Sequence, residues 1–465
     1  MKSTSIQIIE TLRKAGHEAY LAGGCVRDML LDIFPKDFDI ATSATPDEIE
    51  DLLEHTIPVG KQFGVIIAVQ NNFTFEIATF RSDKEYKDGR RPESVEFTDA
   101  KTDALRRDFT INALFYDPIK EEVIDYVDGQ NDLKQKLIRF IGDPEQRIKE
   151  DHLRILRAVR FKNAYNFQYH PDTYQAIRKY VHLIGNISKE RIADELNKMI
   201  MTTSPGQAFE ELFEIGALDI ILPELVKLKG LAQPLEFHKE GDVWDHSIRA
   251  LNSLTNEEID PNPLPAEPAS LELKWAVLFH DIGKFKTFSE DEDRIRYNSH
   301  CEVGAKIAKE VLNRLKFPKK SVDKVAWLIT HHMMVVPFIK MPTHRKRHWF
   351  LHPNFSDLLE LIRADALGII PTDLSAYEKI KKLYHHEIAH LKLLPKQLIA
   401  GEDIMKILNL KTGIQVGKVI ERVRQEQLKH KIKTKKDALN FVKGLKKSIP
   451  FCGSSKSFSI IAISK

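Results

Sequence analysis

Cysteine is scarce in this sequence: the 465-residue chain has three, Cys25, Cys301 and Cys452. Three thiols so far apart exclude a disulfide framework and a Cys-x-x-Cys metal knuckle, and they suit a reducing compartment. Long apolar runs are also missing, so the sequence offers no candidate membrane span and no apolar core of a secretory signal. We therefore expect a cytoplasmic protein with no membrane partner.

Neither sign of charge dominates, because 70 Lys and Arg stand against 67 Asp and Glu and the formal net charge is +3. Overall charge therefore excludes no class of partner. The distribution is uneven, since residues 381–447 hold 17 Lys and Arg against 6 Asp and Glu. Such an excess is typical of a phosphate-binding surface, and equally of a solvated helical face.

The length suggests two or more domains, and the pattern changes along the chain. Near the N-terminus, apolar runs at 19–22, 64–69 and 73–80 predict strands between helical segments, with Asn71-Asn72 as a hairpin turn. Later segments are helical, so the predicted fold class is α+β. The predicted domains are a head at 1–140, a helical neck and body at 141–230, a histidine-rich helical domain at 231–380, a basic helical tail at 381–450 and a disordered end at 451–465.

Two carboxylates, Asp37 and Asp39, stand two residues apart in the head. On a strand they would share one face, roughly 6.5–7 Å apart. Carboxylates so placed can hold Mg²⁺ ions for phosphoryl transfer, and Glu76, in a later predicted strand, is a candidate third ligand. An isolated Asp-x-Asp is more often a solvated turn.

The Gly23-Gly24 turn precedes these acids and follows an apolar strand. Glycines allow backbone N–H groups to approach phosphates closely, and Arg27 is a candidate triphosphate ligand. Most Gly-Gly pairs are simple turns. The combination at short range is what favours a nucleotide site.

Five ordered motifs carry a family resemblance. They are Gly23-Gly24-Cys25-Val26-Arg27-Asp28 with Asp37-Phe38-Asp39, Arg106-Arg107-Asp108-Phe109-Thr110-Ile111-Asn112-Ala113-Leu114, Asp128-Gly129-Gln130-Asn131-Asp132-Leu133, Glu150-Asp151-His152-Leu153-Arg154, and Ser188-Lys189-Glu190-Arg191-Ile192. In this order they resemble the class II tRNA nucleotidyltransferases of the polymerase β-like superfamily. The resemblance implies a head with a small mixed sheet and helices, an all-α neck and body, catalytic acids Asp37 and Asp39 with magnesium, and the tRNA 3′ end, CTP and ATP as substrates. It also implies that nucleotide is bound by Gly24, Arg27, Arg107 and Asp108. The strand pattern makes Glu76 the candidate third catalytic acid.

The fourth motif also has a physical interpretation. On a helix, Ile155, Leu156 and Val159 would form an apolar side, and Asp151, Arg154 and Arg157 a polar one. We therefore expect Asp151 and Arg154 to form a salt bridge at i, i+3. An ordinary exposed ion pair is the plainer interpretation. The resemblance implies instead that Asp151 and Arg154 select C or A without a template, and that Arg157 and Arg160 contact phosphate or base.

Residues 81–92 are highly charged and are expected to form a mobile loop. The family resemblance implies that a loop here accompanies addition of the terminal A. Its presence argues against an enzyme that adds only the two C residues.

A second constellation lies in the histidine-rich region. Each histidine alone is more often a packing or surface residue, but the ordered set His246, His280-Asp281 and Asp365 resembles the HD phosphohydrolase superfamily. Such ligands suit a first-row metal such as Mn, Ni, Co or Fe, which can activate a water molecule toward a phosphoester. The resemblance implies phosphatase or phosphodiesterase activity. It makes His300, His331 and His332 candidates for a second HD metal.

The sequence thus favours addition of the CCA end to tRNA, with a second phosphohydrolase site and the basic tail as a candidate tRNA contact. An A-adding tRNA nucleotidyltransferase that works with a CC-adding partner, or a bacterial poly(A) polymerase, is the alternative. A hypothesis of a different class makes the chain an HD phosphohydrolase with a head that only binds RNA or nucleotide; a third makes it a non-catalytic RNA-binding protein. The oligomeric state stays open.

Overall fold

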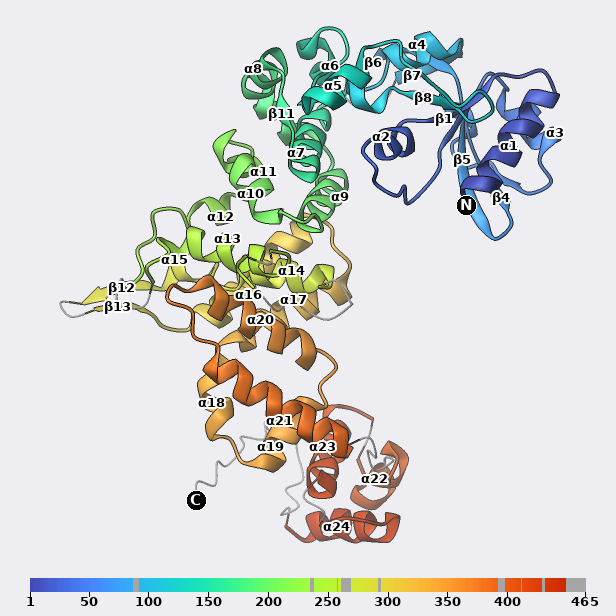
Figure 1. Cartoon of the computed structure of the whole chain (residues 1–465). Coiled ribbons are helices and arrows are strands. Elements are labelled where there is room, and N and C mark those ends of the chain that lie inside the picture. Colours follow the sequence, from blue (N-terminus) through green and yellow to red (C-terminus); the bar gives the residue numbers. More distant parts are fainter. Residues whose placement is uncertain are drawn as a thin grey trace. The chain divides into compact units, whose positions relative to one another are not determined.

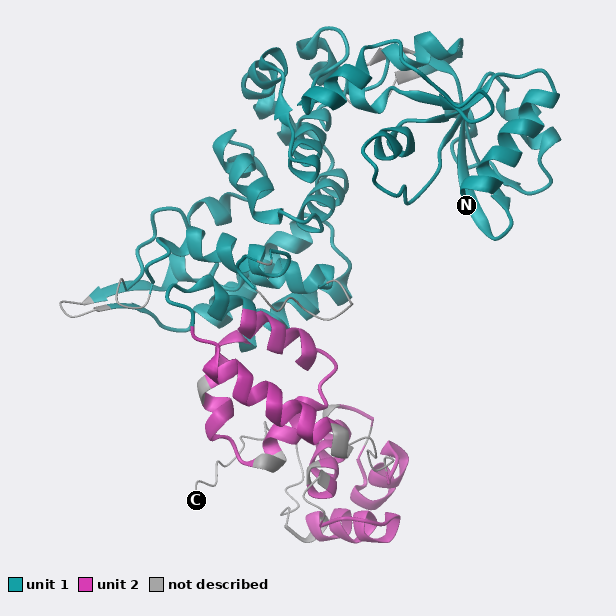
Figure 2. Ribbon diagram, in the orientation of Figure 1, with its two compact units in different colours: residues 1–331, 364–372 teal, residues 332–363, 373–465 magenta. Residues whose placement is uncertain are grey.

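The computed structural model divides the chain into two compact units, residues 1–331 with 364–372 and residues 332–363 with 373–465 (Figure 2). The residues that it describes are 1–86, 92–234, 238–256, 258–260, 269–291, 294–391, 398–410, 412–428 and 431–448. The predicted disorder at 451–465 lies outside these ranges. No helix in the described ranges combines the length and the apolar character that crossing a bilayer requires.

The head is built on one mixed sheet, and the predicted α+β class is confirmed (Figure 1). Within the described residues the strand order is β3-β4-β5-β2-β1-β8-β9, and every pairing is antiparallel except that of β2 with β5. The helix α1 (Lys2–Lys14) packs on β1 and β2 through Ile8, Ile9 and Leu12, which are fully buried. The strands are β1 (Ala19–Ala22), β2 (Ile40–Thr42), β3 (Thr56–Ile57), β4 (Val65–Gln70), β5 (Phe73–Thr79), β8 (Phe115–Asp117) and β9 (Glu122–Ile124).

The predicted hairpin at Asn71-Asn72 is confirmed, because it joins β4 to β5. Both asparagines have positive φ, 52° and 62°, as a two-residue type I′ turn requires. Asparagine tolerates this left-handed conformation better than most residues. The turn therefore fixes the register of β5, in which Glu76 stands opposite Ile67.

The charged segment at 81–92 is only partly a loop. Residues 81–86 form β6 (Arg81–Tyr86), which pairs antiparallel with β7 (Pro92–Phe97). The expectation of a loop is therefore wrong for residues 81–86, where ladder pairing outweighs the charged composition. Residues 87–91 lie outside the described ranges. The other head elements are α2 (Gly24–Leu30), α3 (Pro46–Leu52), η1 (Lys61–Phe63), α4 (Ala100–Leu105), η2 (Thr110–Asn112) and α5 (Gly129–Gln135).

Short helices follow the head, together with the two-stranded parallel pair β10 (Leu137–Ile138) and β11 (Gln168–Tyr169). Several of these helices begin with proline, because the first residues of a helix need no N–H donor for an intrahelical hydrogen bond. The elements are α6 (Pro144–Glu150), α7 (Arg154–Tyr165), α8 (Pro171–Tyr180), η3 (Val181–Asn186), α9 (Lys189–Ile200), α10 (Pro205–Glu214), α11 (Leu218–Ile221) and α12 (Pro223–Val226).

The histidine-rich region is a helical layer around α14 (Leu271–Phe279), which is buried from Leu273 to Phe279. A capping box at Asp242 begins α13 (Val243–Ser253), the helix that carries His246. The remaining elements of this layer are α15 (Lys284–Thr287), β12 (Phe288–Asp291), β13 (Arg294–Tyr297), α16 (His300–Arg314) and α17 (Lys319–His331), together with the end of α20 (Phe355–Gly368).

The second unit is helical in its described residues. Its last three helices share a small apolar core that includes Ile404, Val423 and Val442. Its elements are η4 (His332–Met334), α18 (Val335–Lys340), α19 (Thr343–Phe350), most of α20, α21 (Ser375–Leu391), α22 (Gly401–Leu408), α23 (Ile414–Leu428) and α24 (Lys435–Ser448).

Candidate active site in the head and histidine cluster

We expected Asp37 and Asp39 to lie on a strand. They lie instead in the segment just before β2, which begins at Ile40. The backbone alternates as a strand would, because Phe38 between them is buried and Asp37 is exposed. The backbone oxygen of Asp39 accepts a hydrogen bond from the N–H of Ala22, at 3.0 Å. The segment is thus attached to the end of β1, and both carboxylates share one side.

Glu76 is brought to Asp39 by the one parallel pairing in the described sheet. Ile40 in β2 pairs with Ile77 in β5, so Asp39 and Glu76 each stand one residue before that pair. Burial, followed by the charges of Glu76 and Asp37, raises the pKa of Asp39 to about 7, against the opposing effect of Arg107. Three carboxylates that repel one another fit a site that a divalent cation would neutralise.

The glycine turn lies against Arg107. Gly23 has φ of 70°, and a Cβ there would stand 3.0 Å from Nη1 of Arg107. The guanidinium of Arg107 is held by two hydrogen bonds to Oδ2 of Asp103, at 2.9 and 3.1 Å. Asp103 is buried and was missed from the sequence, since it belongs to none of the recognised motifs. Its effect is to aim Arg107 toward Gly23 and Asp39.

Arg27 is buried with its charge already satisfied. It donates to Oδ1 of Asp28 at 2.7 Å and to Oδ1 of Asn112 at 2.6 Å. Its guanidinium also lies over the rings of Tyr165 and Phe161, with its central carbon 4.6 and 5.1 Å from their centroids. The hydrogen bonds to Asp28 and Asn112 use three of the five N–H donors of the guanidinium, and the triphosphate contact of Arg27 stays a prediction.

Asp108 joins the head to α7. Its Oδ2 accepts a hydrogen bond from Nε of Arg157 at 2.7 Å and lies 2.6 Å from Nη2 of the same guanidinium. Burial opposes the charged form of Asp108, but Arg157 and Arg154 outweigh burial and lower its pKa. The predicted nucleotide contacts of Asp108 and Arg157 thus start from a charged pair in close contact.

The expected salt bridge between Asp151 and Arg154 is wrong. Helix α6 ends at Glu150 and α7 begins at Arg154, and Asp151 between them is extended, with φ of −144° and ψ of 105°. The 100° helical step that placed the two side chains together does not apply across this break. The side chain of Asp151 pairs instead with Arg191, at 2.7 Å.

Arg154 has other partners around its guanidinium. It pairs with Glu150 at 2.7 Å and donates to the backbone oxygens of Arg147 and Arg106 at 2.9 and 3.2 Å. Arg154 is therefore held in place without Asp151.

The rest of α7 follows the helical pattern. Its expected apolar side is confirmed, because Ile155, Leu156 and Val159 are fully buried. On the polar side, Arg160 pairs with the buried Glu195 at 2.6 Å. Acidic partners outside the motif cores, such as Glu195, carried no sequence signal of their own.

The four predicted HD ligands converge in one place. Nε2 of His246 lies 3.1 Å from Nε2 of His280 and 3.1 Å from Oδ1 of Asp365. Oδ2 of Asp281 lies 3.3 Å from Nε2 of His280 and 3.7 Å from Nε2 of His246. His280, at the end of α14, is oriented by its Nδ1, which lies 2.7 Å from the backbone oxygen of Val277. The donor set fits a first-row divalent metal.

Opposite charges lie close together within this cluster. Burial opposes the charged form of His280, but Asp281 and Asp365 outweigh burial and raise its pKa to about 10. Asp281 also pairs with Nζ of Lys284 at 2.6 Å and lies 3.5 Å from Nε2 of His300. His300 is therefore placed beside the cluster.

His331 and His332 are the other two candidate ligands of a second metal. Nδ1 of His331 lies 2.7 Å from the backbone oxygen of Trp327, one turn back on α17. His332 begins the second compact unit. A binuclear centre stays a prediction.

One carboxylate beside the HD cluster was missed altogether. Glu240 lies 3.3 Å from Nδ1 of His246 and 2.6 Å from Nδ1 of His238. His238 and Glu240 precede α13 in the short stretch His238-Lys239-Glu240, which matches no recognised motif. No signal in the sequence could therefore have found this residue.

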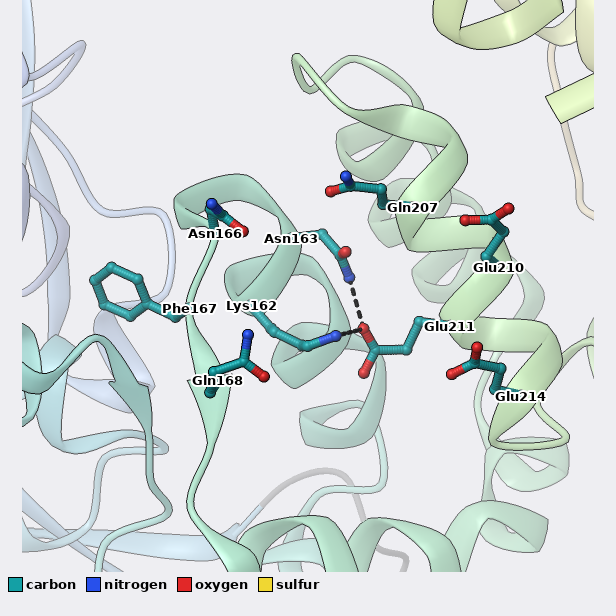
Figure 3. A pocket seen from close by; sticks show the side chains of 9 residues that line it. All are labelled: Lys162, Asn163, Asn166, Phe167, Gln168, Gln207, Glu210, Glu211 and Glu214. Atoms are coloured by element: carbon teal, nitrogen blue, oxygen red, sulfur yellow. Dashed lines mark hydrogen bonds and ion pairs between the residues drawn. The ribbon is translucent and has the colours of Figure 1, made fainter. Parts of the chain in front are cut away.

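A polar cavity of about 270 Å³ lies apart from both sites, between α7, β11 and α10 (Figure 3). Lys162 and Asn163 point across it to Glu211, which accepts a hydrogen bond from each. Its charged groups are thus partly paired with one another. The cavity lies in the helical region after the head and contains none of the predicted site residues.

The head site and the histidine cluster together define a metal-dependent nucleotidyltransferase with an appended HD domain. Three family models match the chain in this order: "Poly A polymerase head domain" at residues 19–139, "Probable RNA and SrmB- binding site of polymerase A" at 166–228, and "HD domain" at 243–337.

Whole-chain relatives name the family. The chain is 46% identical over 438 residues to a CCA-adding enzyme of Bacillus pumilus, covering 94% of this chain and 95% of the relative. It is 29% identical over 442 residues to one of Bacillus velezensis, covering 93% and 95%. A solved structure of the Bacillus stearothermophilus CCA-adding enzyme in complex with CTP is similar, with a TM-score of 0.64, 25% identity and coverage of 96% and 97%. The chain therefore belongs to the CCA-adding enzyme family.

Proposed function

We propose that this chain completes the 3′ end of tRNA, adding C, C and A from CTP and ATP without a nucleic-acid template. The observation that carries the proposal is the carboxylate cluster of Asp37, Asp39 and Glu76, in a chain that matches a CCA-adding enzyme along nearly its whole length. The similar Bacillus stearothermophilus enzyme was solved with CTP, one of the two proposed nucleotides. These relatives favour CCA addition over the A-adding and poly(A) alternatives.

Magnesium held by Asp37, Asp39 and Glu76 would supply charge neutralisation for the attacking 3′-oxygen and the leaving pyrophosphate. The 3′-oxygen of the RNA forms a bond to the α-phosphorus of the nucleotide, and the bond from that phosphorus to the oxygen that bridges to the β-phosphate breaks. The hydroxyl proton passes to solvent. Arg107, aimed by Asp103 toward the glycine turn, stabilises the negative charge of the triphosphate.

Base selection is proposed for Asp151 and Arg154. Each is held by a separate partner, Arg191 for Asp151 and Glu150 for Arg154, so the two side chains have fixed positions without touching each other through a salt bridge. A carboxylate accepts and a guanidinium donates, which suits the Watson–Crick edge of cytosine or adenine. Asp151→Ala should therefore raise incorporation of GTP or UTP about tenfold or more relative to CTP and ATP.

The test supplies full-length protein with tRNA that ends at the discriminator base or at CC. With CTP and ATP together, both substrates should end in CCA, and CTP alone should add two residues to the shorter one. Addition of a single A to the CC substrate, with no C added to the shorter one, rejects CCA addition in favour of an A-adding enzyme. Long A tails on unrelated RNA would indicate a poly(A) polymerase.

A second function is proposed for the HD cluster: hydrolysis of a phosphoester with Mn, Ni, Co or Fe. The convergence of His246, His280, Asp281 and Asp365 favours it. Hydrolysis of a 2′,3′-cyclic nucleotide or a phosphomonoester should require one of these metals and should disappear in His280→Ala. Hydrolysis that persists in that variant would reject the assignment.

The basic tail at 381–450 is proposed to contact the tRNA backbone. Lys431, Lys433, Lys435 and Lys436 are exposed, as such a contact requires. Replacing Lys435 and Lys436 by alanine should raise KM for tRNA and leave kcat unchanged. We also propose the domain boundaries predicted from the sequence and a cytoplasmic location for the protein.

A further inference from the structure

A buried carboxylate, Glu240, lies behind the HD cluster and outside the set of predicted ligands. Its side chain is 1% exposed. Oε2 accepts a hydrogen bond from the backbone N–H of Ile370 at 2.8 Å, and Oε1 lies 2.6 Å from Nδ1 of His238. The same Oε1 lies 3.3 Å from Nδ1 of His246. The carboxylate is therefore fixed by two partners while it faces the third.

His246 is confined on its other sides as well. A Cβ on Gly368 would stand 2.8 Å from Cε1 of the His246 ring, so only glycine leaves room for the ring in this position. Nε2 of the ring points to His280 and Asp365, at 3.1 Å from each. The two ring nitrogens of His246 thus face different groups, a single carboxylate on one side and the ligand cluster on the other.

We propose that Glu240 is a positioning residue of the HD site, which holds His246 in the tautomer with its proton on Nδ1. A neutral imidazole carries one ring proton, and an ionised carboxylate can only accept a hydrogen bond. Glu240 therefore draws the proton to Nδ1 and leaves the lone pair of Nε2 directed at the cluster, where a metal ligand needs it. The inference rests on the proposed HD function.

Glu240→Gln tests this with almost no change of volume. The Ile370 N–H requires an oxygen at the Oε2 position, so the amide must place its NH₂ group at the Oε1 position, toward His238 and His246. That NH₂ donates, which makes Nδ1 of His246 an acceptor and moves the ring proton to Nε2. A protonated Nε2 cannot bind a metal. Gln should therefore impair the site at least as much as Ala, although Gln preserves the packing.

The experiment titrates Ni²⁺ by calorimetry into the untagged full-length chain carrying Asp37→Asn and Asp39→Asn, so that the head carboxylates do not take up the probe. Against this background, Glu240→Gln should weaken Ni²⁺ binding about 10- to 100-fold. The matched control is Glu211→Gln, a buried carboxylate near the cavity of Figure 3, which should leave the affinity unchanged. Unfolding temperatures measured in EDTA show whether each variant is folded.

Three results would overturn the inference. Affinity that stays at the level of the background in a folded Glu240→Gln rejects the tautomer role. Affinity lost in Glu240→Ala but kept in Glu240→Gln means that Glu240 acts only by filling space. If His280→Ala leaves the isotherm unchanged, the HD metal site itself is wrong and the inference falls with it, which separates that failure from the first two.

Discussion

The two candidate sites of this chain hold carboxylates in opposite surroundings. In the head, Asp37 and Glu76 are exposed and repel the half-buried Asp39. In the HD cluster, His246, His280 and Asp281 are almost completely buried, and their charges are matched by one another and by Lys284. An open site of hard oxygen ligands suits a metal that arrives with a phosphate substrate, whereas a buried site of mixed ligands suits a resident metal.

The largest expected effect is the loss of nucleotide transfer in Asp37→Ala, with Ni²⁺ binding at the HD cluster unchanged. Asp37→Ala removes one carboxylate of the head cluster, so nucleotide transfer should fall about a thousandfold or more, because several kcal/mol of charge stabilisation are lost. The measurement is single-turnover addition of labelled CMP to tRNA. Ni²⁺ binding at the HD cluster should stay within about twofold of the wild-type value; a parallel loss there would mean that the sites are not independent.

The reverse experiment is His280→Ala. Removing a fully buried ligand should weaken Ni²⁺ binding at the HD cluster about 100-fold or more and abolish any metal-dependent hydrolysis. The exposed His55→Ala is the matched control. Transfer of CMP should remain near the wild-type rate in both variants, and a large loss of transfer in His280→Ala would contradict the comparison.

A smaller effect concerns pH at the head site. The pKa of Asp39 is raised to about 7, so below pH 7 a proton competes with the metal, and above it the carboxylate is free. The Mg²⁺ concentration that gives half-maximal transfer should therefore be about tenfold higher at pH 6 than at pH 8. Asp39→Asn cannot serve as a control, because it also removes a ligand; a flat dependence in the wild type is sufficient to reject the prediction.

A further effect, on stability and not on activity or metal binding, is expected in α14, the helix that ends just before His280. Lys274 in α14 is 2% exposed, and burial lowers its pKa to about 8. Below pH 8 it is charged in both the folded and the unfolded state, so the folded state bears the cost of burying the charge. Lys274→Met should raise the free energy of unfolding by up to about 3 kcal/mol at pH 7.

The sign of the pH effect follows from the same values. Between pH 8 and the ordinary pKa of 10.5, the unfolded state binds more protons than the folded state, so wild-type stability rises with pH and the advantage of Lys274→Met shrinks. Urea denaturation at pH 7 and pH 9.5 measures both. Lys309→Met, at an exposed position on α16, should change stability by less than about 0.5 kcal/mol.

Sequence reasoning reached the parts of the fold that depend on local patterns. The strands β1, β4 and β5 and the Asn71-Asn72 turn follow from alternation and turn chemistry. The convergence of the predicted HD ligands follows from an ordered set of residue types. Sequence reasoning failed where a pairing depends on tertiary structure. Asp151 lies at a break between two helices, so its partner is Arg191, forty residues away.

Glu240 shows the same limit in another form. A lone glutamate in a turn before α13 carries no pattern, and its role depends on Ile370 and Gly368, which only the folded chain brings beside it. The charged composition at 81–86 predicts a loop wrongly, because composition does not report ladder pairing with another strand.

The Asn71-Asn72 turn has a consequence for insertions and deletions. One residue added to this turn would set the pairing of β5 with β4 against its pairing with β2. A shift of β5 by one position against β2 would direct Glu76 to the buried side, with Phe75 or Ile77 toward Asp39. The length of this surface hairpin is thus coupled to the placement of a candidate active-site carboxylate. Relatives that vary freely at other turns should keep the spacing between this hairpin and the third carboxylate.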